Sequence, residues 1–228
     1  MSPVPDGSTL AAVAARARRL ELAPLGAFHP VEGDGAPEGC GTLVLLGPDG
    51  PGFWPRFTAS PEYRDGAPDP LDRWSARVVA ALAAAFGGAA ILPFGGPPFA
   101  PFTAWARRSG EAWISPVGLL VHARLGLLVS YRGALALPGR LELPPRGPRP
   151  CDSCPAPCLA ACPVGALKGG PYDLRACHGF LDTSRGGDCM DRGCAVRRAC
   201  PVGRGLRPEA QSAFHMAAFH GTQGPCDA

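Results

Sequence analysis

Cysteine is concentrated near the carboxyl end of this chain, and this concentration constrains the fold more than any other feature. Eight of the ten cysteines lie between Cys151 and Cys200. The first residues lack the apolar core and cleavage site of a secretory leader, so we expect a compartment in which thiols stay reduced. In such a compartment, clustered cysteines predict metal ligation or redox chemistry rather than a disulfide framework.

The clustered cysteines form two groups of four, and each group ends in a Cys-Pro pair. The first group has the spacing Cys-x2-Cys-x3-Cys-x3-Cys-Pro from Cys151 to Pro163, and the second runs from Cys177 to Pro201. The pentapeptide ACPVG occurs at the end of both groups, at residues 161–165 and 199–203. This repeat is typical of ferredoxins that bind two [4Fe–4S] clusters, although the spacing is wider than in the usual bacterial motif.

The motif also predicts which cysteine belongs to which cluster. In two-cluster ferredoxins, three closely spaced thiolates bind one cubane and the cysteine before proline binds the other. Carried over to this sequence, the first cluster would have the ligands Cys151, Cys154, Cys158 and Cys200. The second cluster would have the ligands Cys162, Cys177, Cys189 and Cys194. The neighbouring side chains His178, Asp188 and Arg192 could tune the cluster potentials, or could simply lie on the surface.

Two tetrahedral zinc sites with four cysteines each are an alternative that eight thiolates also satisfy. Such sites would make the region a zinc-stabilised interaction module without redox activity. Structural zinc ribbons usually contain paired Cys-x2-Cys knuckles, and here only Cys151 and Cys154 have that spacing. The sequence therefore favours iron–sulfur clusters.

The region before the cysteines alternates helix-like with strand-like segments. Residues 41–47 form a short apolar run between turn residues, which predicts a buried strand, and further strands are expected at 89–94 and 125–137. Ser8 is expected to cap a first helix over residues 10–20. Asp69 as cap and Pro70 at the first position predict another helix, with the apolar face Leu71, Trp74, Val78, Leu82 and Phe86. Helices that alternate with strands indicate a layered α/β or α+β domain.

Changes in composition mark the domain boundaries. Residues 144–150 are rich in proline, which suits neither a helix nor a central strand, so we interpret them as a linker. We therefore predict an α/β domain over residues 1–143, a cluster domain over residues 151–207, and a C-terminal helix and tail over residues 208–228.

Charge and hydropathy argue against two classes of partner. The net charge is +3 and the arginines are scattered, whereas a nucleic-acid interface needs clustered basic residues. The longest strongly apolar stretch, residues 78–94, is too short for a comfortable bilayer span and is interrupted by two glycines. We expect a soluble cytoplasmic protein that binds neither a membrane nor nucleic acid.

The runs ACPVGAL (161–167) and PYDLRACHGFLDT (171–183) resemble the cluster-binding half of epoxyqueuosine reductases and the related corrinoid-dependent reductive dehalogenases. Residues 114–137 resemble the segment that precedes the cluster domain in that family. The resemblance implies a nitroreductase-like α/β fold for the first domain, which holds cobalamin in those enzymes, followed by a ferredoxin-like domain with two [4Fe–4S] clusters. It also implies that Cys177 is an isolated ligand that opens a short helix.

One departure from the family bears on activity. Epoxyqueuosine reductases carry an acidic residue in a Val-Asp-x-Ala-Pro stretch, whereas the corresponding residues 93–99 contain no carboxylate. The resemblance therefore argues against epoxyqueuosine as the substrate and leaves open whether the chain is an enzyme.

The loop over residues 94–102 is a candidate cofactor site. Phe94, Gly95 and Gly96 could line a pocket, because two glycines allow a ligand to approach the backbone closely, and His122 could face the same cavity. The alternatives are a turn with a hydrophobic plug and a packed histidine.

Three functions are consistent with these patterns. The first is an iron–sulfur electron-transfer protein, or an oxidoreductase component, that exchanges electrons with a soluble donor or acceptor protein. The second is a corrinoid- or flavin-dependent reductase whose clusters relay electrons to cobalamin or flavin and then to a small-molecule substrate. The third is the zinc-stabilised interaction module.

Overall fold

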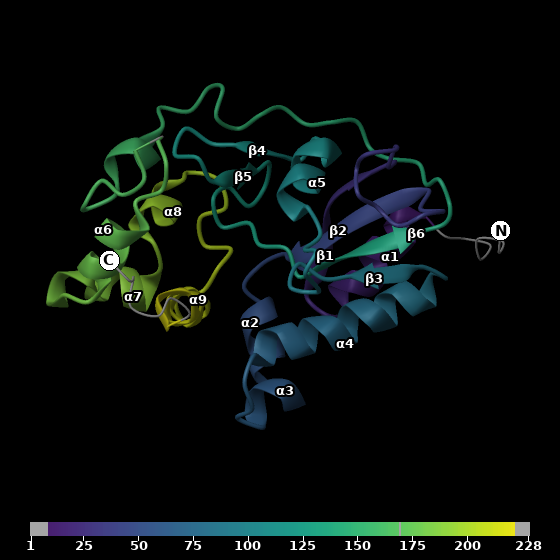
Figure 1. Cartoon of the computed structure of the whole chain (residues 1–228), viewed down its shortest axis with the longest axis horizontal. Helices are drawn as coiled ribbons and strands as arrows, with labels where there is room; N and C mark the ends of the chain where they lie inside the picture. Colours follow the sequence, from purple (N-terminus) through teal and green to yellow (C-terminus); the bar gives the residue numbers. More distant parts are fainter. Residues whose placement is uncertain (1–8, 169, 222–228) are drawn as a thin grey trace. The chain divides into compact units, whose positions relative to one another are not determined.

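The computed structural model describes residues 9–168 and 170–221 and shows a mixed α/β protein, as predicted (Figure 1). The chain divides into two compact units. The first unit contains the residues up to Ala112 together with Val129–Pro148, and the second contains Trp113–Leu128 together with the residues from Arg149 onward. Both units are therefore built from two separate stretches of sequence.

A four-stranded antiparallel sheet forms the centre of the first unit. Its strands lie in the order β1 (Leu22–Phe28), β2 (Thr42–Pro48), β6 (Gly133–Leu137) and β3 (Ala89–Ile91). Every residue of β2 is buried, which confirms the strand predicted over residues 41–47. A central strand covered on both faces needs apolar side chains at successive positions rather than an alternating pattern, and β2 has the sequence TLVLLGP.

Three helices pack against this sheet: α1 (Leu10–Arg18) and α5 (Phe102–Ser109) contact β1, and α4 (Pro70–Ala85) contacts β3 and β6. The predicted apolar face of α4 is buried, since Trp74, Val78 and Leu82 are each 2% exposed. The sixteen-residue helix thus covers one part of the sheet with the side chains that the helical spacing selects.

Several local predictions about this unit were wrong. Asp69 does precede α4, but its backbone is left-handed (φ 51°) and its side chain makes no capping hydrogen bond. Thr9 caps α1 by accepting a hydrogen bond from the Ala12 backbone N–H at 3.1 Å, and Ser8 lies outside the described residues. The strand expected over residues 89–94 ends at Ile91, shortly before Pro93, which lacks a backbone N–H to donate. The strand expected over 125–137 covers only Gly133–Leu137, because the chain turns tightly before it.

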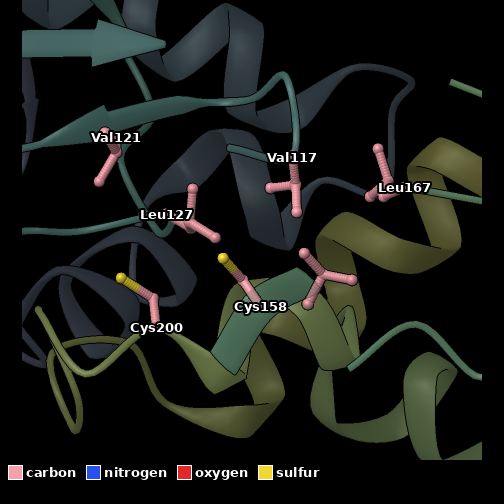
Figure 2. Packing of buried hydrophobic residues seen from close by; sticks show 7 residues of the cluster. Val117, Val121, Leu127, Cys158, Leu167 and Cys200 are labelled. Carbon is pink, nitrogen blue, oxygen red and sulfur yellow. The ribbon is translucent and has the colours of Figure 1, made fainter. Parts of the chain in front are cut away.

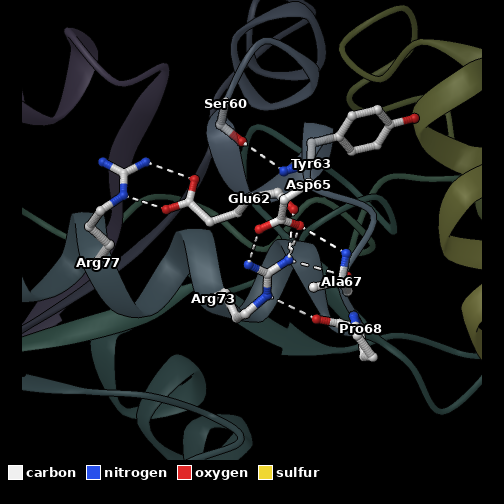
Figure 3. Close-up of polar contacts among 8 residues, drawn as sticks. All are labelled: Ser60, Glu62, Tyr63, Asp65, Ala67, Pro68, Arg73 and Arg77. Carbon is white, nitrogen blue, oxygen red and sulfur yellow. Dashed lines mark hydrogen bonds and ion pairs between the residues drawn. The ribbon is translucent and has the colours of Figure 1, made fainter.

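Two ion pairs fasten the short helix α3 (Pro61–Arg64) to α4 (Figure 3). Arg77 forms a two-pronged pair with the buried carboxylate of Glu62, and its Nη2 donates to Oε2 at 2.9 Å. Arg73 donates to both carboxylate oxygens of Asp65, at 2.7 and 2.8 Å. The guanidinium of Arg77 lowers the pKa of Glu62 to about 2, and that of Arg73 lowers the pKa of Asp65 to about 2. The α2 helix (Phe53–Thr58) packs on α3 beside this contact.

Short helices and one hairpin make up the second unit. The hairpin pairs β4 (Ala112–Ile114) with β5 (Leu120–His122). The remaining elements are η1 (Pro157–Ala160), α6 (Leu174–Leu181), η2 (Ser184–Gly186), α7 (Gly187–Arg192), α8 (Ala195–Ala199) and α9 (Glu209–Gly221). Residues 144–150, which we interpreted as a linker, form no helix or strand. The predicted C-terminal helix is present as α9, and the predicted tail over residues 222–228 lies outside the described residues.

The hairpin joins the cysteine-rich region although it lies far before the predicted boundary. Arginine side chains hold its carboxyl end in place: Arg197 donates to the carbonyl oxygen of Leu127 at 2.6 Å, and Arg207 donates to that of Leu128. The cysteine-rich region therefore includes residues from both sides of the linker. Over residues 9–168 and 170–221, no helix combines the length and the apolar character that crossing a bilayer requires.

Candidate metal centre

The first predicted set of cysteines surrounds a common pocket in the second unit. Its four members line a pocket of about 290 Å³, counting the part open to solvent: Cys151, Cys154, Cys158 and Cys200. Their thiolate charges are close enough to repel one another. The structure therefore brings together three cysteines from one loop and a fourth that lies more than forty residues later in the sequence.

Apolar side chains enclose this pocket. Figure 2 shows Cys158 and Cys200 among Val117, Val121 and Leu127, with the hairpin on one side and the loop helices on the other. Cys158 is 7% exposed and Cys200 is 8% exposed. Burial raises the pKa of the Cys151 and Cys158 thiols, and the neighbouring thiolates raise it further. Burial therefore favours the protonated thiols, and four thiolates in such surroundings would need a cation to compensate their charge.

Two glycines allow Cys200 to reach the pocket. Gly126 has φ +56°, and a Cβ at this position would collide with the carbonyl oxygen of Val202 and lie 2.8 Å from the sulfur of Cys200. Gly203 has φ +77°, and its Cβ would lie 2.5 Å from the carbonyl oxygen of Leu125. The turn after β5 and the Cys-Pro segment thus approach each other so closely that only glycine fits at the contact.

The second predicted set converges as well. Its members come from the loop after η1, from α6, from α7 and from the residue before α8: Cys162, Cys177, Cys189 and Cys194. Their charges also interact, and burial raises the pKa of Cys177 and Cys189. Cys189 packs with Leu181 and Met216 in a small core, and Met216 comes from α9. The resemblance implies that Cys177 opens a short helix. In the structure, Cys177 instead lies in the middle of α6.

Hydrogen-bond donors point at the sulfur atoms of this second set. The backbone N–H of Ala166 donates to the sulfur of Cys162 at 3.2 Å, and the phenol of Tyr172 donates to the sulfur of Cys177 at 3.1 Å. The backbone N–H of Ala195 opposes the effect of burial on the pKa of Cys189. Donors of this kind offset negative charge on a thiolate.

The short helix α8 separates the two sets. Cys194 precedes this helix and belongs to the second set, whereas Cys200 follows it and belongs to the first. Six residues of helical rise separate the two backbones by about 9 Å. The crossed arrangement therefore places both sets within a single unit, one short helix apart.

Among residues 9–168 and 170–221, no three Cys, His, Asp or Glu side chains are close enough together to bind one metal ion. A zinc ion at Zn–S distances of about 2.3 Å draws its four sulfurs to within about 3.8 Å of one another. The four cysteines of the first set line one pocket without forming such a group.

The other predicted cofactor residues lie in different units. Phe94, Gly95 and Gly96 belong to the loop between β3 and α5 of the first unit, where Phe94 is partly buried and Gly95 is exposed. His122 belongs to the second unit, is 1% exposed, and accepts hydrogen bonds at Nδ1 from the backbone N–H groups of Arg124 and Leu125. These bonds give His122 a role in the turn that follows β5.

Of the side chains expected beside the clusters, Asp188 and Arg192 lie on the surface and His178 is half-buried. Asp188 accepts hydrogen bonds from Arg192 at 3.2 Å and from Arg198, and Arg192 also donates to Glu209 at 2.6 Å, which ties α7 to α9. His178 packs against Phe219, with ring centroids 4.7 Å apart.

Three residues near the cysteines were not foreseen. Ser115 is 5% exposed and lines the first pocket, and its hydroxyl has no hydrogen-bond partner among the described residues. Tyr172 lies in the run PYDL, which was singled out only for its resemblance to a family motif. Arg197 is partly buried, and burial lowers its pKa. No sequence pattern distinguishes Arg197, because the run AVRRA that contains it is typical of an ordinary solvated helix.

Comparison with known proteins adds no family to this geometry. No protein-family model, curated protein or solved structure matches the chain. The chemistry of the site therefore follows from its own residues.

Proposed function

We propose that the second unit binds two [4Fe–4S] clusters and that the protein transfers single electrons. One observation carries this proposal: eight cysteines converge as two sets of four, and the sets are crossed as a two-cluster ferredoxin repeat requires. If each site used four consecutive cysteines, Cys200 would belong to the second set instead of the first.

The sequence spacing and the donors at the sites favour a cluster over a zinc ion. Structural zinc ribbons usually contain paired Cys-x2-Cys knuckles, and among the eight clustered cysteines only Cys151 and Cys154 have that spacing. The N–H and O–H groups that point at Cys162 and Cys177 match the donors that stabilise cluster thiolates in iron–sulfur proteins.

The residues of the second unit would hold, shield and space the clusters. Such clusters accept and release one electron at a time. The apolar side chains of Val117, Val121 and Leu127 exclude water from the first set, while α8 keeps the two sets a short distance apart. Both properties suit a protein that passes an electron between two neighbouring centres.

The proposal also has finer parts. The cysteine repeat supports a ferredoxin-like second unit, and the family resemblance supports a nitroreductase-like first unit. A cytoplasmic location and a soluble electron donor or acceptor protein complete the proposal. A corrinoid- or flavin-dependent reductase with a small-molecule substrate is the wider version of the same proposal. It predicts that cobalamin or flavin added to the purified protein binds with a change in its visible spectrum.

Substitution of single cysteines tests the crossed ligand sets. We expect Cys158→Ala and Cys200→Ala to remove the same cluster, and Cys162→Ala and Cys194→Ala to remove the other, each leaving about half of the iron. Iron per chain and the electron paramagnetic resonance (EPR) spectrum of the reduced protein identify the cluster that remains. Cys40→Ala is the matched control, because this thiol lies outside both sets, and it should retain all the iron.

The decisive comparison is between Cys194→Ala and Cys200→Ala. These two positions are consecutive cysteines in the sequence. Ligand sets made of consecutive cysteines would place both in the same cluster, so the two variants would then have the same spectrum. Identical residual spectra would therefore contradict the crossed assignment, and wild-type protein without iron would contradict the proposed function.

A further inference from the structure

We infer that the two cluster sites are not equivalent, and that Tyr172 and Arg197 give the site of Cys162, Cys177, Cys189 and Cys194 the higher reduction potential. This inference rests on the proposed function and adds to it the order in which the two centres hold an electron. It follows from the charges and hydrogen-bond donors around each set of thiols.

Tyr172 acts on the second site through a direct contact. Its phenol donates to the sulfur of Cys177 at 3.1 Å. The ring is held by a stacked contact with Phe219, with centroids 6.3 Å apart and planes inclined by 6°. A hydrogen bond to a ligand sulfur stabilises the more negative, reduced form of a cluster and so raises its potential.

Arg197 adds a positive charge beside the same site. Its Nη1 donates to the carbonyl oxygen of Leu127 at 2.6 Å, which fixes the direction of the side chain. Its electrostatic neighbours are the thiol of Cys194 and the phenol of Tyr172. A guanidinium that is partly shielded from solvent interacts more strongly than one in water, so it too favours the reduced form.

At the first site, the backbone N–H groups of Cys158 and Leu159 act on the Cys158 sulfur, but the cation and the side-chain hydroxyl are weaker counterparts. Its cation is Arg149, whose side chain is 41% exposed and lies 3.8 Å from the carboxylate of Asp152, so solvent and an opposite charge reduce its effect. Its hydroxyl is Ser115, which lines the pocket without donating to a sulfur. The balance of these groups favours the second site.

The surface charges near Cys189 do not alter this order. Arg198 and Asp188 both face Cys189, with opposite signs, and they are bonded to each other. Their effects on the site therefore largely cancel. Arg197 remains as the cation of the second site that has no carboxylate among its electrostatic neighbours.

The unequal potentials give electron transfer a direction within the unit. With both clusters bound, an electron leaving the first would reduce the second, and an external one-electron donor protein would reduce the first again. A single electron in the protein would then reside at the site that Tyr172 and Arg197 adjoin.

Potentiometry monitored by EPR on the anaerobically purified full chain tests this inference. The wild-type protein should show two midpoint potentials. Tyr172→Phe keeps the ring stack and removes only the hydroxyl, and it should lower the reduction equilibrium constant of the higher-potential centre about tenfold, or about 59 mV for one electron. The lower potential should not change, and iron per chain should equal that of the wild type.

Arg197 provides a second, independent variant. Arg197→Gln should also lower the higher potential, and Arg197→Lys, which keeps the positive charge, should restore most of the shift. Ser115→Ala is the matched control on the other site and should leave the higher potential unchanged. If Tyr172→Phe loses iron, the two Arg197 variants still decide the question.

Three results would overturn the inference while leaving two clusters in place. They are two equal wild-type potentials, Tyr172 and Arg197 variants that move the lower potential instead, and variants that move neither. A wild-type chain without iron and sulfide would overturn the proposed function itself, and the inference with it.

Discussion

At the scale of single residues, the position of Cys200 depends on a contact between two stretches of backbone. Gly126 and Gly203 lie where the turn after β5 meets the segment after Cys200, and neither position has room for a Cβ. The last cysteine of the first set is therefore positioned by a segment, the turn after β5, that contains no cysteine. This explains why the pocket needs residues from before the linker.

Gly126→Ala tests this dependence. The methyl group would collide with the carbonyl of Val202 and crowd the sulfur of Cys200, in a left-handed conformation that alanine adopts reluctantly. We expect a loss of stability of about 1–3 kcal/mol and a loss of iron from the first cluster alone. Iron per chain and the EPR spectrum of the reduced variant measure the effect.

Gly118→Ala is the matched control for this prediction. Gly118 also has a left-handed backbone (φ +78°), but the nearest atom to its Cβ would be 4.0 Å away, at the carbonyl of Gly170. The Gly118→Ala substitution should therefore strain the backbone but should not reduce the iron content of the protein. Equal iron loss in both variants would show that strain in the hairpin, rather than the contact with Cys200, is responsible.

At this scale, the sequence predicts only the residues that belong to its internal repeat. The two Cys-Pro halves were enough to predict the cysteine sets, because the ligand order of a two-cluster motif is encoded in the spacing. Ser115, Tyr172 and Arg197 could not be predicted in the same way. Each acquires its role only from tertiary contacts with distant residues.

At the scale of helices and strands, the attachment of α3 to α4 gives the first unit a dependence on pH. The pKa of Glu62 is lowered to about 2 by Arg77, from an ordinary value of 4.5. A carboxyl whose folded pKa is depressed adds stability above its unfolded value, and this stability is lost as the pH falls toward the folded value. The window for Glu62 is therefore pH 4.5 down to about 2.

Glu62→Gln should lower the free energy of unfolding by roughly 1 kcal/mol at pH 6, and by less at pH 3. Urea unfolding followed by tryptophan fluorescence at the two pH values measures the difference between variant and wild type. Glu38→Gln, at an exposed carboxylate, is the control and should change little at either pH. A difference between wild type and Glu62→Gln that is the same at pH 3 and pH 6 would contradict the role of the charge.

The elements that the sequence predicted correctly are those with a strong local pattern. The β2 strand, the α4 helix and the α9 helix follow from continuous or periodic apolar residues. The strand expected over residues 125–137 was wrong because apolar character alone does not distinguish a strand from a buried turn. Here residues 122–126 close a turn with two backbone hydrogen bonds of 3.0 Å, and their apolar neighbours pack around the cysteines.

At the scale of the whole molecule, the two units do not follow the order of the sequence. The chain leaves the first unit at Ala112, contributes the hairpin to the second, and returns for β6 before the linker. A cut before Cys151 would therefore separate the cysteines from Ser115, Val121 and Leu127, which line the pocket. The composition of the linker predicted a boundary, but it could not reveal that an earlier segment belongs beyond it.

The central claim is that the second unit holds iron and inorganic sulfide in two compact sites. Iron, acid-labile sulfide and zinc, measured per chain in protein purified without oxygen, test it most directly. We predict about eight iron and about eight sulfide per chain, as two clusters of four each, with visible absorbance that bleaches on reduction. About two zinc ions per chain in a colourless protein without sulfide would contradict the account.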